Sequence, residues 1–363
     1  MQEERKKILK MVEDGIISSE EAEEIFDSLD KAEQAKYQQV SQHVDWDQAE
    51  SNSNYYQKQA KSGTTAKKLL GFIEEAFSKI KNVDLDFNFG THTKVSHIFQ
   101  SQQPEIEKVD VDISNGNLQI VPWDERDVRI ECEAKVYQES KLDEARKRFL
   151  SDVEFHLDNG ILRFYIPSKQ LKTDVVIRIP ELLYDKVTIK LFNGSIDVEN
   201  LQVKQFRSKT TNGAITLQGI SGETYMVETA NGSIKVEQAV LKELEAETIN
   251  GSIHLNGEFD HVDAQAVSGS IHTMWNGIEA KSGFFKTTTG SIRLHLPQRL
   301  KVDGKLATNI GSIHCNFSDY KVIEKKSEMM RNLLHFEANS EIEQLLHLEA
   351  ETKTGSIWML PNE

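Results

Sequence analysis

The feature that most constrains this chain is the four-residue pattern Asn-Gly-Ser-Ile, which returns at a nearly constant spacing in the C-terminal two thirds. Successive glycines of the pattern lie 19, 19, 19, 18, 21, 21 and 44 residues apart, and the last interval equals two steps of 22. A fixed period near twenty is typical of a solenoid, in which each repeat buries its apolar face against the next. The repeat glycines are Gly194, Gly213, Gly232, Gly251, Gly269, Gly290, Gly311 and Gly355.

Residues on both sides of each glycine alternate between apolar and polar, which is the period of a β-strand. After the glycine, Ser233-Ile234-Lys235-Val236 is typical, with Ile and Val on the inward side. Before the glycine runs a second alternating segment, with threonine three residues ahead in six of the eight copies. No helical period fits between the glycines. We therefore expect a mainly β chain, a parallel β-solenoid with about 20 residues and two or three strands per turn.

The repeated polar residues predict how each turn of the solenoid is held. Glycine supplies a corner with positive φ, and the Asn or Thr before it can form a local hydrogen bond. Inward Thr and Asn would then form ladders of identical side chains along the stack. We interpret the eight glycines as structural corners rather than as parts of a phosphate-binding loop, because they are periodic.

Charge and cysteine content narrow the classes of partner. The net charge is −15 and the isoelectric point about 5.3, which argues against a nucleic-acid backbone and favours cationic peptides or basic protein surfaces. The two cysteines, Cys132 and Cys315, lack ligand spacing, so neither a disulfide framework nor a zinc site is expected. No export signal or spanning apolar run is evident, which predicts a cytoplasmic or peripheral membrane location and leaves surface exposure by another route open.

Three segments precede the repeats. Residues 1–40 predict an acidic helical hairpin that is too small to be stable alone, so self-association or docking to a protein is expected. Residues 41–65 predict a flexible polar linker, and 66–100 an amphipathic helix with a segment that either caps the solenoid or contacts a membrane surface. The interaction candidates in these segments are Asp14, Gly15, Ile16, Ser19, Glu20, Glu21, Phe72 and Phe77.

The solenoid domain is predicted to span 105–361 and to be irregular near both ends. Residues 139–150 indicate a short inserted helix, and Asp158-Asn159-Gly160 indicates the turn of a hairpin. We interpret 105–180 as the first, irregular turns. We expect 315–350 to hold one turn with an insertion, helical between Met329 and Phe336.

Two groups of side chains resemble reactive sites. The third position after the glycine reads His254, His272, Arg293 and His314 in what the sequence presents as successive turns. Such a column could hold a metal ion or respond to acid, but a solvated ladder of side chains is the favoured interpretation. Asp110 and Asp112 lie on one side of a strand, as a glycosidase pair would, although alternating acids on an exposed strand are ordinary. We therefore expect no catalytic residues, no cofactor and no metal.

The helical hairpin around residues 14–22, Asp-Gly-Ile-Ile-Ser-Ser-Glu-Glu-Ala, followed by a linker and serial Asn-Gly-Ser-Ile turns, resembles one bacterial family. This family is the LiaX/YvlB type of cell-envelope stress protein, which carries an adhesin-type β-solenoid domain of unknown function. The resemblance covers essentially the whole chain. It implies no enzymatic activity, an N-terminal part that senses cationic membrane-active peptides, and a solenoid that restrains signalling through small membrane proteins.

The sequence thus favours a non-catalytic regulatory or scaffold protein of the envelope stress response. Its expected partners are copies of itself or envelope-stress membrane proteins, with cationic peptides or a membrane surface as further contacts and no nucleic acid. The alternative is a solenoid that binds or cleaves cell-wall carbohydrate. Such a protein would need an outward aromatic or carboxylate face, whereas Phe206 and Tyr225 fall on the inward register.

Overall fold

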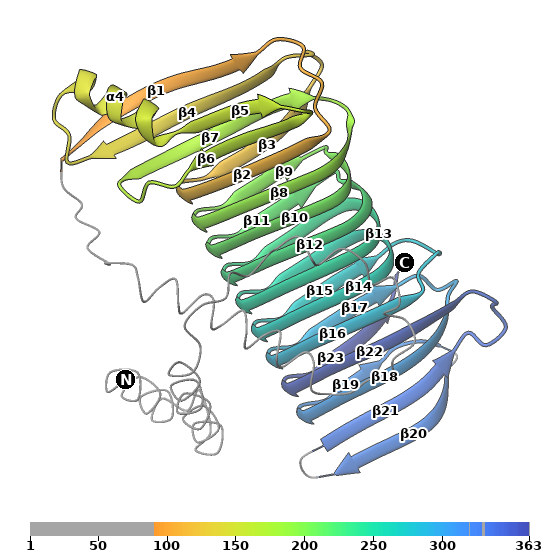
Figure 1. Cartoon of the computed structure of the whole chain (residues 1–363). Coiled ribbons are helices and arrows are strands. Elements are labelled where there is room, and N and C mark those ends of the chain that lie inside the picture. The colour runs from red at the N-terminus through yellow and green to blue at the C-terminus, as the bar shows by residue number, and fades with distance from the viewer. Residues whose placement is uncertain (1–90, 319, 329–330, 363) are drawn as a thin grey trace, which may run out of the picture. The chain divides into compact units, whose positions relative to one another are not determined.

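The computed structural model describes residues 91–318, 320–328 and 331–362. The hairpin, linker and amphipathic helix predicted before residue 91 lie outside the described residues. Within the described part the chain is mainly β, with one helix, and its strands join into one hydrogen-bonded sheet system (Figure 1). The first strand of the described residues begins at His92, before the boundary predicted at residue 105.

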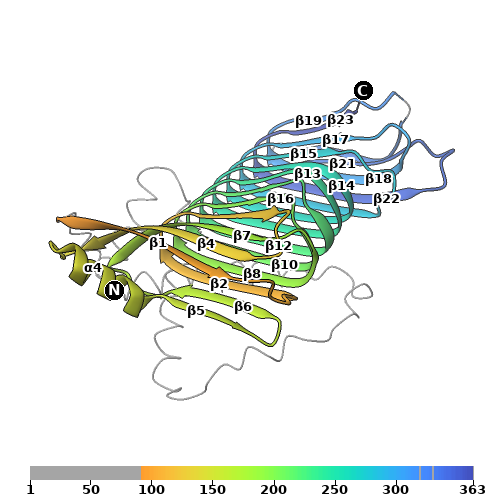
Figure 2. The same ribbon diagram turned by 90° about the horizontal axis from the view of Figure 1, so that it is seen from above.

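The repeating unit is a long strand, a glycine corner and a short strand, and we call this unit a rung. Two strands per rung therefore form two parallel sheets, one of long strands and one of short strands, as Figures 1 and 2 show. The strands β13 and β14 each run through the short strand of one rung and the long strand of the next. The strands of these rungs are β8 (Leu183–Asn193), β9 (Ile196–Glu199), β10 (Gln202–Asn212), β11 (Ile215–Gln218), β12 (Ser221–Asn231), β13 (Ile234–Asn250), β14 (Ile253–Ser268), β15 (Ile271–Trp275), β16 (Ser282–Thr289) and β17 (Ile292–Leu296).

Consecutive rungs pair in parallel with equivalent residues side by side. Thr210 pairs with Thr229, and Thr229 with Thr248, along the long strands. Ile215 pairs with Ile234 along the short strands. The parallel stacking predicted for consecutive copies is therefore present from β8 to β17.

The core lies between the two sheets, where inward side chains of equal shape stack on one another. The isoleucine after the corner serine or alanine forms a column on the short strands that is fully buried except at Ile313, which is half-buried. Phe206 stacks on Tyr225 with ring centroids 4.9 Å apart. Trp275 contacts both Phe259 and Phe285 edge-on. Each buried aliphatic side chain contributes about 1.5–3 kcal/mol of transfer free energy, so this column is a major source of stability.

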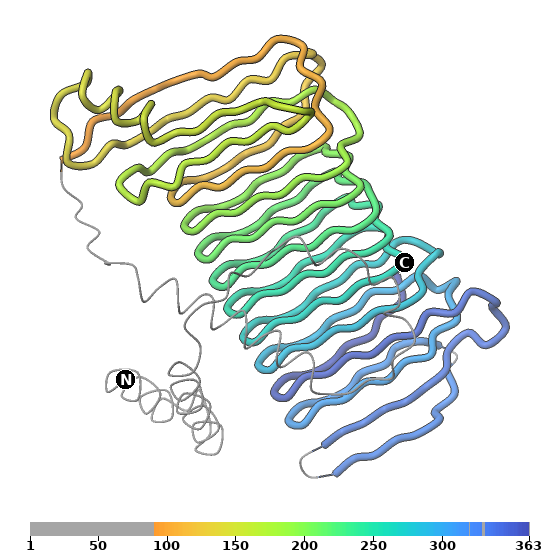
Figure 3. The backbone as a smooth tube through the Cα atoms, in the orientation of Figure 1, coloured from red at the N-terminus to blue at the C-terminus, as the bar shows by residue number. Residues whose placement is uncertain are grey.

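The C-terminal rung is inserted into the stack rather than added at its end. Its strands are β22 (Leu345–Thr354) and β23 (Ile357–Pro361), and they pair with β16 and β17 on one side. On the other side they pair with β18 (Lys301–Ile310) and β19 (Ile313–Cys315). In Figure 3 the chain runs from β17 to β18 past the position between them, and the later strands β22 and β23 return to occupy that position. The expectation that every repeat contacts the next one in sequence is therefore wrong at this point.

The N-terminal end of the stack is interleaved in the same way. The rung of β2 (Lys108–Asn115) and β3 (Leu118–Trp123) lies between two later rungs. On its outer side are β6 (Ile161–Ile166) and β7 (Leu171–Pro180), and on its inner side are β8 and β9. The first and last rungs of the chain are thus held by ladders on both sides, which opposes fraying from either end.

Antiparallel strands and one helix close the N-terminal end. The strands are β1 (His92–Ser101), β4 (Val128–Tyr137) and β5 (Glu154–Asp158), and β5 forms the predicted hairpin with β6. The helix predicted at 139–150 is α4 (Leu142–Asp152), which buries Phe149 near Phe99. Among the described residues, no helix has the length and apolar character to span a membrane.

The other end is closed by an antiparallel hairpin of β20 (Tyr320–Glu328) and β21 (Arg331–Ala338). The helix predicted from Met329 to Phe336 is wrong, because residues 331–336 belong to β21, which pairs with β18. Leu334 and Phe336 are buried while His335 is half-buried, so the alternation of a strand governs this segment. The edge of β18 pairs with β21 along most of its length, so the backbone groups of this segment are satisfied by a ladder rather than by a helix of about two turns.

Candidate functional site

The corner glycines form a column in which backbones approach too closely for any side chain. A Cβ atom built on Gly213 would lie 1.9 Å from the carbonyl oxygen of Gly194, one rung away. Across the eight predicted corners this distance is 1.8 to 2.1 Å. Gly116 occupies the equivalent corner of the first rung, with φ of 125°. These glycines therefore serve packing of one rung on the next.

The repeated threonines hold the corners from the neighbouring rung, and not locally as the sequence suggested. The Thr229 hydroxyl donates to the carbonyl oxygen of Gly213 at 2.9 Å. At the last corner, Asn332 of the closing hairpin donates to Gly311 instead. The carbonyl of Gly251 faces Ala266, which has no hydroxyl to donate. The remaining bonds run from Thr210 to Gly194, Thr248 to Gly232, Thr287 to Gly269, Thr352 to Gly290 and Thr308 to Gly355.

The predicted asparagine ladder exists, but it lies at the surface. Asn212 donates to Asn193 at 2.7 Å, and Asn231 donates to Asn212 at 2.9 Å. The side chains of Asn212, Asn231 and Asn250 are exposed rather than inward. The ladder therefore reinforces the register at the rim of the core.

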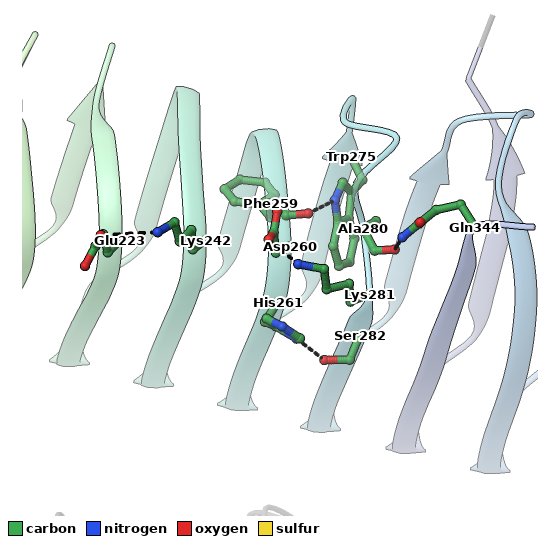
Figure 4. A network of polar contacts seen from close by, with 10 residues as sticks. All are labelled: Glu223, Lys242, Phe259, Asp260, His261, Trp275, Ala280, Lys281, Ser282 and Gln344. Carbon is green, nitrogen blue, oxygen red and sulfur yellow. Dashed lines mark hydrogen bonds and ion pairs between the residues drawn. The ribbon is translucent and has the colours of Figure 1, made fainter. Parts of the chain in front are cut away.

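A column of alternating charge follows the opposite corner, and the sequence analysis missed it. Along the stack it reads Asp185, Lys204, Glu223, Lys242, Asp260 and Lys281. Each lysine pairs with the acid one rung before it, at 2.6, 3.2 and 2.7 Å, and Figure 4 shows the last two pairs. The signal was available in the sequence as acid and lysine alternating at the repeat spacing. Because the pairs are largely exposed, they favour one register more than they add stability.

The other predicted candidates lie in different places. Asp14, Gly15, Ile16, Ser19, Glu20, Glu21, Phe72 and Phe77 fall outside the described residues. Asp110 and Asp112 point outward from β2, as predicted, and the Tyr165 hydroxyl donates a hydrogen bond to Asp110. Burial and this carboxylate raise the pKa of Tyr165 to about 12.

Outward side chains of the C-terminal short strands form a surface that we call the basic face. It comprises His254, His272, Arg293, His295, Trp358 and His314. The rings of His254 and His272 lie 5.1 Å apart between centroids. The prediction that His314 follows Arg293 in the next turn is wrong. The inserted rung places Trp358 between these two side chains. The Arg293 guanidinium lies 5.2 Å from the Trp358 ring centroid, and His314 stacks on the other side at 5.6 Å.

A shallow groove crosses this face over four neighbouring strand segments. Its volume is about 280 Å³, and its lining includes His254, His272, Arg293 and His295 together with the exposed Met274. Burial and the neighbouring His254, Arg293 and His295 lower the pKa of His272. At the N-terminal end of the groove, Glu237 is paired with Lys235 at 2.9 Å. The groove therefore brings one arginine and three histidines together in a chain whose net charge is −15, and its positive charge grows as the histidines are protonated.

Metal binding by the histidine column would need further ligands. In the described part of the chain, no group of three His, Cys, Asp or Glu side chains is placed to hold a metal ion. A histidine pair alone leaves a site for Zn²⁺ short of the three or four protein ligands that such sites use.

Comparison with known proteins shows what the chain is similar to. A sequence profile described as Toastrack DUF4097 matches residues 106–349, and one described as a SHOCT-like domain matches residues 3–34. An uncharacterized protein of Bacillus subtilis, YvlB, is 38% identical over 360 residues, which cover 98% of each chain. A crystal structure of an adhesin candidate from Parabacteroides distasonis has a TM-score of 0.46 at 10% identity, over 75% of this chain and 98% of that one. One from Bacteroides fragilis has a TM-score of 0.34 at 10% identity, over 74% and 98%.

Proposed function

The chain belongs to the Toastrack DUF4097 family, and from this premise we propose that it is a non-catalytic scaffold protein of the bacterial cell-envelope stress response. In this proposal the stacked rungs act as one rigid β-solenoid that presents its outward side chains to a protein partner. The acidic N-terminal segment joins copies of the chain or attaches it to a membrane-associated protein or a cationic peptide.

The interleaving of rungs at both ends of the described stack is the observation that carries this proposal. The first and last rungs each have a neighbour on both sides, and the ladders continue without a break from β6 to β21. A continuous stack of this kind bends little, so it can hold partners at fixed positions along its length. The side chains that point inward stabilise the fold. The outward positions of both sheets are therefore available for recognition.

The sequence pattern of the N-terminal segment supports separate roles for this segment and for the stacked rungs. Residues 1–30 carry ten acidic and four basic side chains, and all of these lie within residues 3–34, which the SHOCT-like profile matches. Acidic surfaces attract cationic peptides and basic proteins through long-range electrostatics. The resemblance to LiaX-type proteins, drawn from the hairpin and the repeats, points to envelope stress as the setting.

Removal of residues 1–34 tests the proposal. Full-length and shortened chains are compared by gel filtration, by crosslinking in cells treated with a cationic membrane-active antibiotic, and by thermal unfolding. The proposal expects the shortened chain to lose self-association or its crosslinked partner while its unfolding midpoint is unchanged. Identical elution and identical crosslinked partners would refute it. Turnover of a cell-wall glycan by the full-length chain would refute its non-catalytic part.

A further inference from the structure

We propose that the basic face is a binding site for a linear polymer of phosphate groups, which lies along the groove across the short strands. This inference goes beyond the scaffold role and does not depend on it. The groups expected to contact phosphate oxygens are His254, His272, Arg293 and His295, with Trp358 and His314 extending the site along the stack.

The distribution of charge on these short strands is the first argument. From Ile253 to the end of β23, the outward positions of the described short strands hold four histidines and one arginine, and no carboxylate. The strands nearer the N-terminus differ, since Asp197 and Glu199 point outward from β9, and Glu237 of β13 lies at that end of the groove, paired with Lys235. When the histidines are protonated, these side chains repel one another, because the outward positions of these short strands hold no carboxylate to offset their charge. A bound anion would remove the repulsion.

The arginine supplies the second argument, because its donors are uncommitted. Arg293 is exposed, and among the described residues its guanidinium has the Trp358 ring as its contact and pairs with no carboxylate. Stacking on an indole holds the guanidinium plane while its N–H groups stay available at the edge. An arginine fixed in this way is suited to bidentate binding of an oxyanion.

The shape of the groove indicates a chain-like ligand. Its lining comes from β13, β14, β15 and β17, so it runs along the stack and crosses successive rungs. Rungs repeat at about 4.8 Å, which gives a row of donors at regular intervals. A flexible polymer with one anionic group per unit can engage several of these donors at once, and such linkage raises affinity well above that of a single group.

Phosphate fits the donors better than carboxylate does. The donors belong to two adjacent columns, with His272 and Arg293 in one and His295 in the other. A tetrahedral phosphate directs acceptor oxygens toward both columns, whereas the two oxygens of a carboxylate lie in one plane with their carbon.

Binding should strengthen as the histidines become protonated. The charged groups facing them are Lys235 and Glu237 of β13, Arg293 of β17 and the other histidines of the face. The ordinary pKa of histidine lies near 6.5, and burial, followed by the neighbouring His254, Arg293 and His295, lowers the pKa of His272. A bound polyanion opposes this lowering, because it favours the charged form of each ring.

The test is isothermal titration calorimetry of the full-length chain with a short linear polyphosphate at about pH 6 and about pH 8, on either side of the ordinary histidine pKa. The variant His272→Gln/Arg293→Ala removes two donors. The control His156→Gln/Arg331→Ala removes the same residue types from exposed positions on β5 and β21, away from the face. Thermal unfolding of each variant verifies folding. As a second measurement on the unaltered chain, NMR follows the histidine pKa values with and without polyphosphate.

We expect polyphosphate to bind the unaltered chain and the control at least about tenfold more tightly than the double variant, and more tightly at the lower pH. We expect the NMR titration to show a higher pKa for His272 when polyphosphate is present. Three results would overturn the proposal. These are equal binding by all three proteins, equal binding of polyglutamate, and binding of phosphatidylglycerol vesicles without binding of free polyphosphate.

Discussion

Replacing Thr229 with valine removes one hydrogen bond of the corner column and almost nothing else. Valine has the shape of threonine, and the side chain is fully buried in the core. The hydroxyl donates to the Gly213 carbonyl at 2.9 Å, and this carbonyl lies outside the strand ladders. The substitution thus leaves a partly buried acceptor without its donor.

The expected loss is about 1–2 kcal/mol in the free energy of unfolding, which is the cost of an unsatisfied acceptor that water reaches only in part. For a body of this size, that loss lowers the unfolding midpoint by roughly 2 to 8 °C. Thermal and urea unfolding followed by circular dichroism measure both quantities. The urea slope should not change, because the substitution leaves the surface exposed on unfolding the same.

Thr216 provides the matched control. It points outward from β11 and is half-buried, so Thr216→Val should change stability by less than about 0.5 kcal/mol. If the two valine variants unfold at the same midpoint, the hydroxyl of Thr229 does not support the corner, and the explanation given for the repeated threonine is incorrect.

Three further predictions concern other positions of the stack. Gly213→Ala should lower the free energy of unfolding by more than about 3 kcal/mol or prevent folding, because the new Cβ would overlap a carbonyl oxygen at 1.9 Å. The neighbouring substitution Ala214→Ser should be tolerated, and soluble yield and unfolding midpoints check both variants. Ala266→Thr should raise stability by about 1 kcal/mol, since it supplies the hydroxyl that the Gly251 corner lacks, and an unchanged or lower midpoint would contradict this. Folding lowers the pKa of His272, so the unfolded chain binds more protons than the folded chain and stability falls as pH drops below about 6.5. His272→Gln should make this fall in stability shallower, which unfolding curves between about pH 7 and pH 5 measure.

The sequence allowed the period, the corners and the inward columns to be predicted because each copy meets the same local demands. A corner that brings two backbones together requires glycine, as at Gly213 and Gly232, and the inward column needs an aliphatic side chain in each rung, which is isoleucine after the eight predicted corners and Leu118 in the first rung. The Asp158-Asn159-Gly160 turn was likewise readable, since Asn159 and Gly160 both adopt positive φ.

The order of the rungs could not be predicted in this way. The interval of 44 residues before Gly355 suits two sequential turns as well as an excursion and a return. The inward pattern of β22 is the same in either arrangement, so pairing with β16 is decided by the ladders available in three dimensions. The position of Trp358 in the basic face depends on that choice, which explains why only part of the face could be predicted from the sequence.

Engineered disulfides test whether the C-terminal rung is inserted between β16 and β18. With Cys132 and Cys315 replaced by alanine, the pair Lys286→Cys/Glu351→Cys is compared with Lys286→Cys/Ala307→Cys. Lys286 and Glu351 are partners in adjacent strands, and their charged atoms lie 3.4 Å apart. Parallel neighbours are close enough for a disulfide, whereas strands two places apart are not. The account predicts rapid crosslinking of 286 to 351 and none of 286 to 307 on non-reducing gels. Crosslinking of 286 to 307, with 286 and 351 remaining as free thiols, would contradict it.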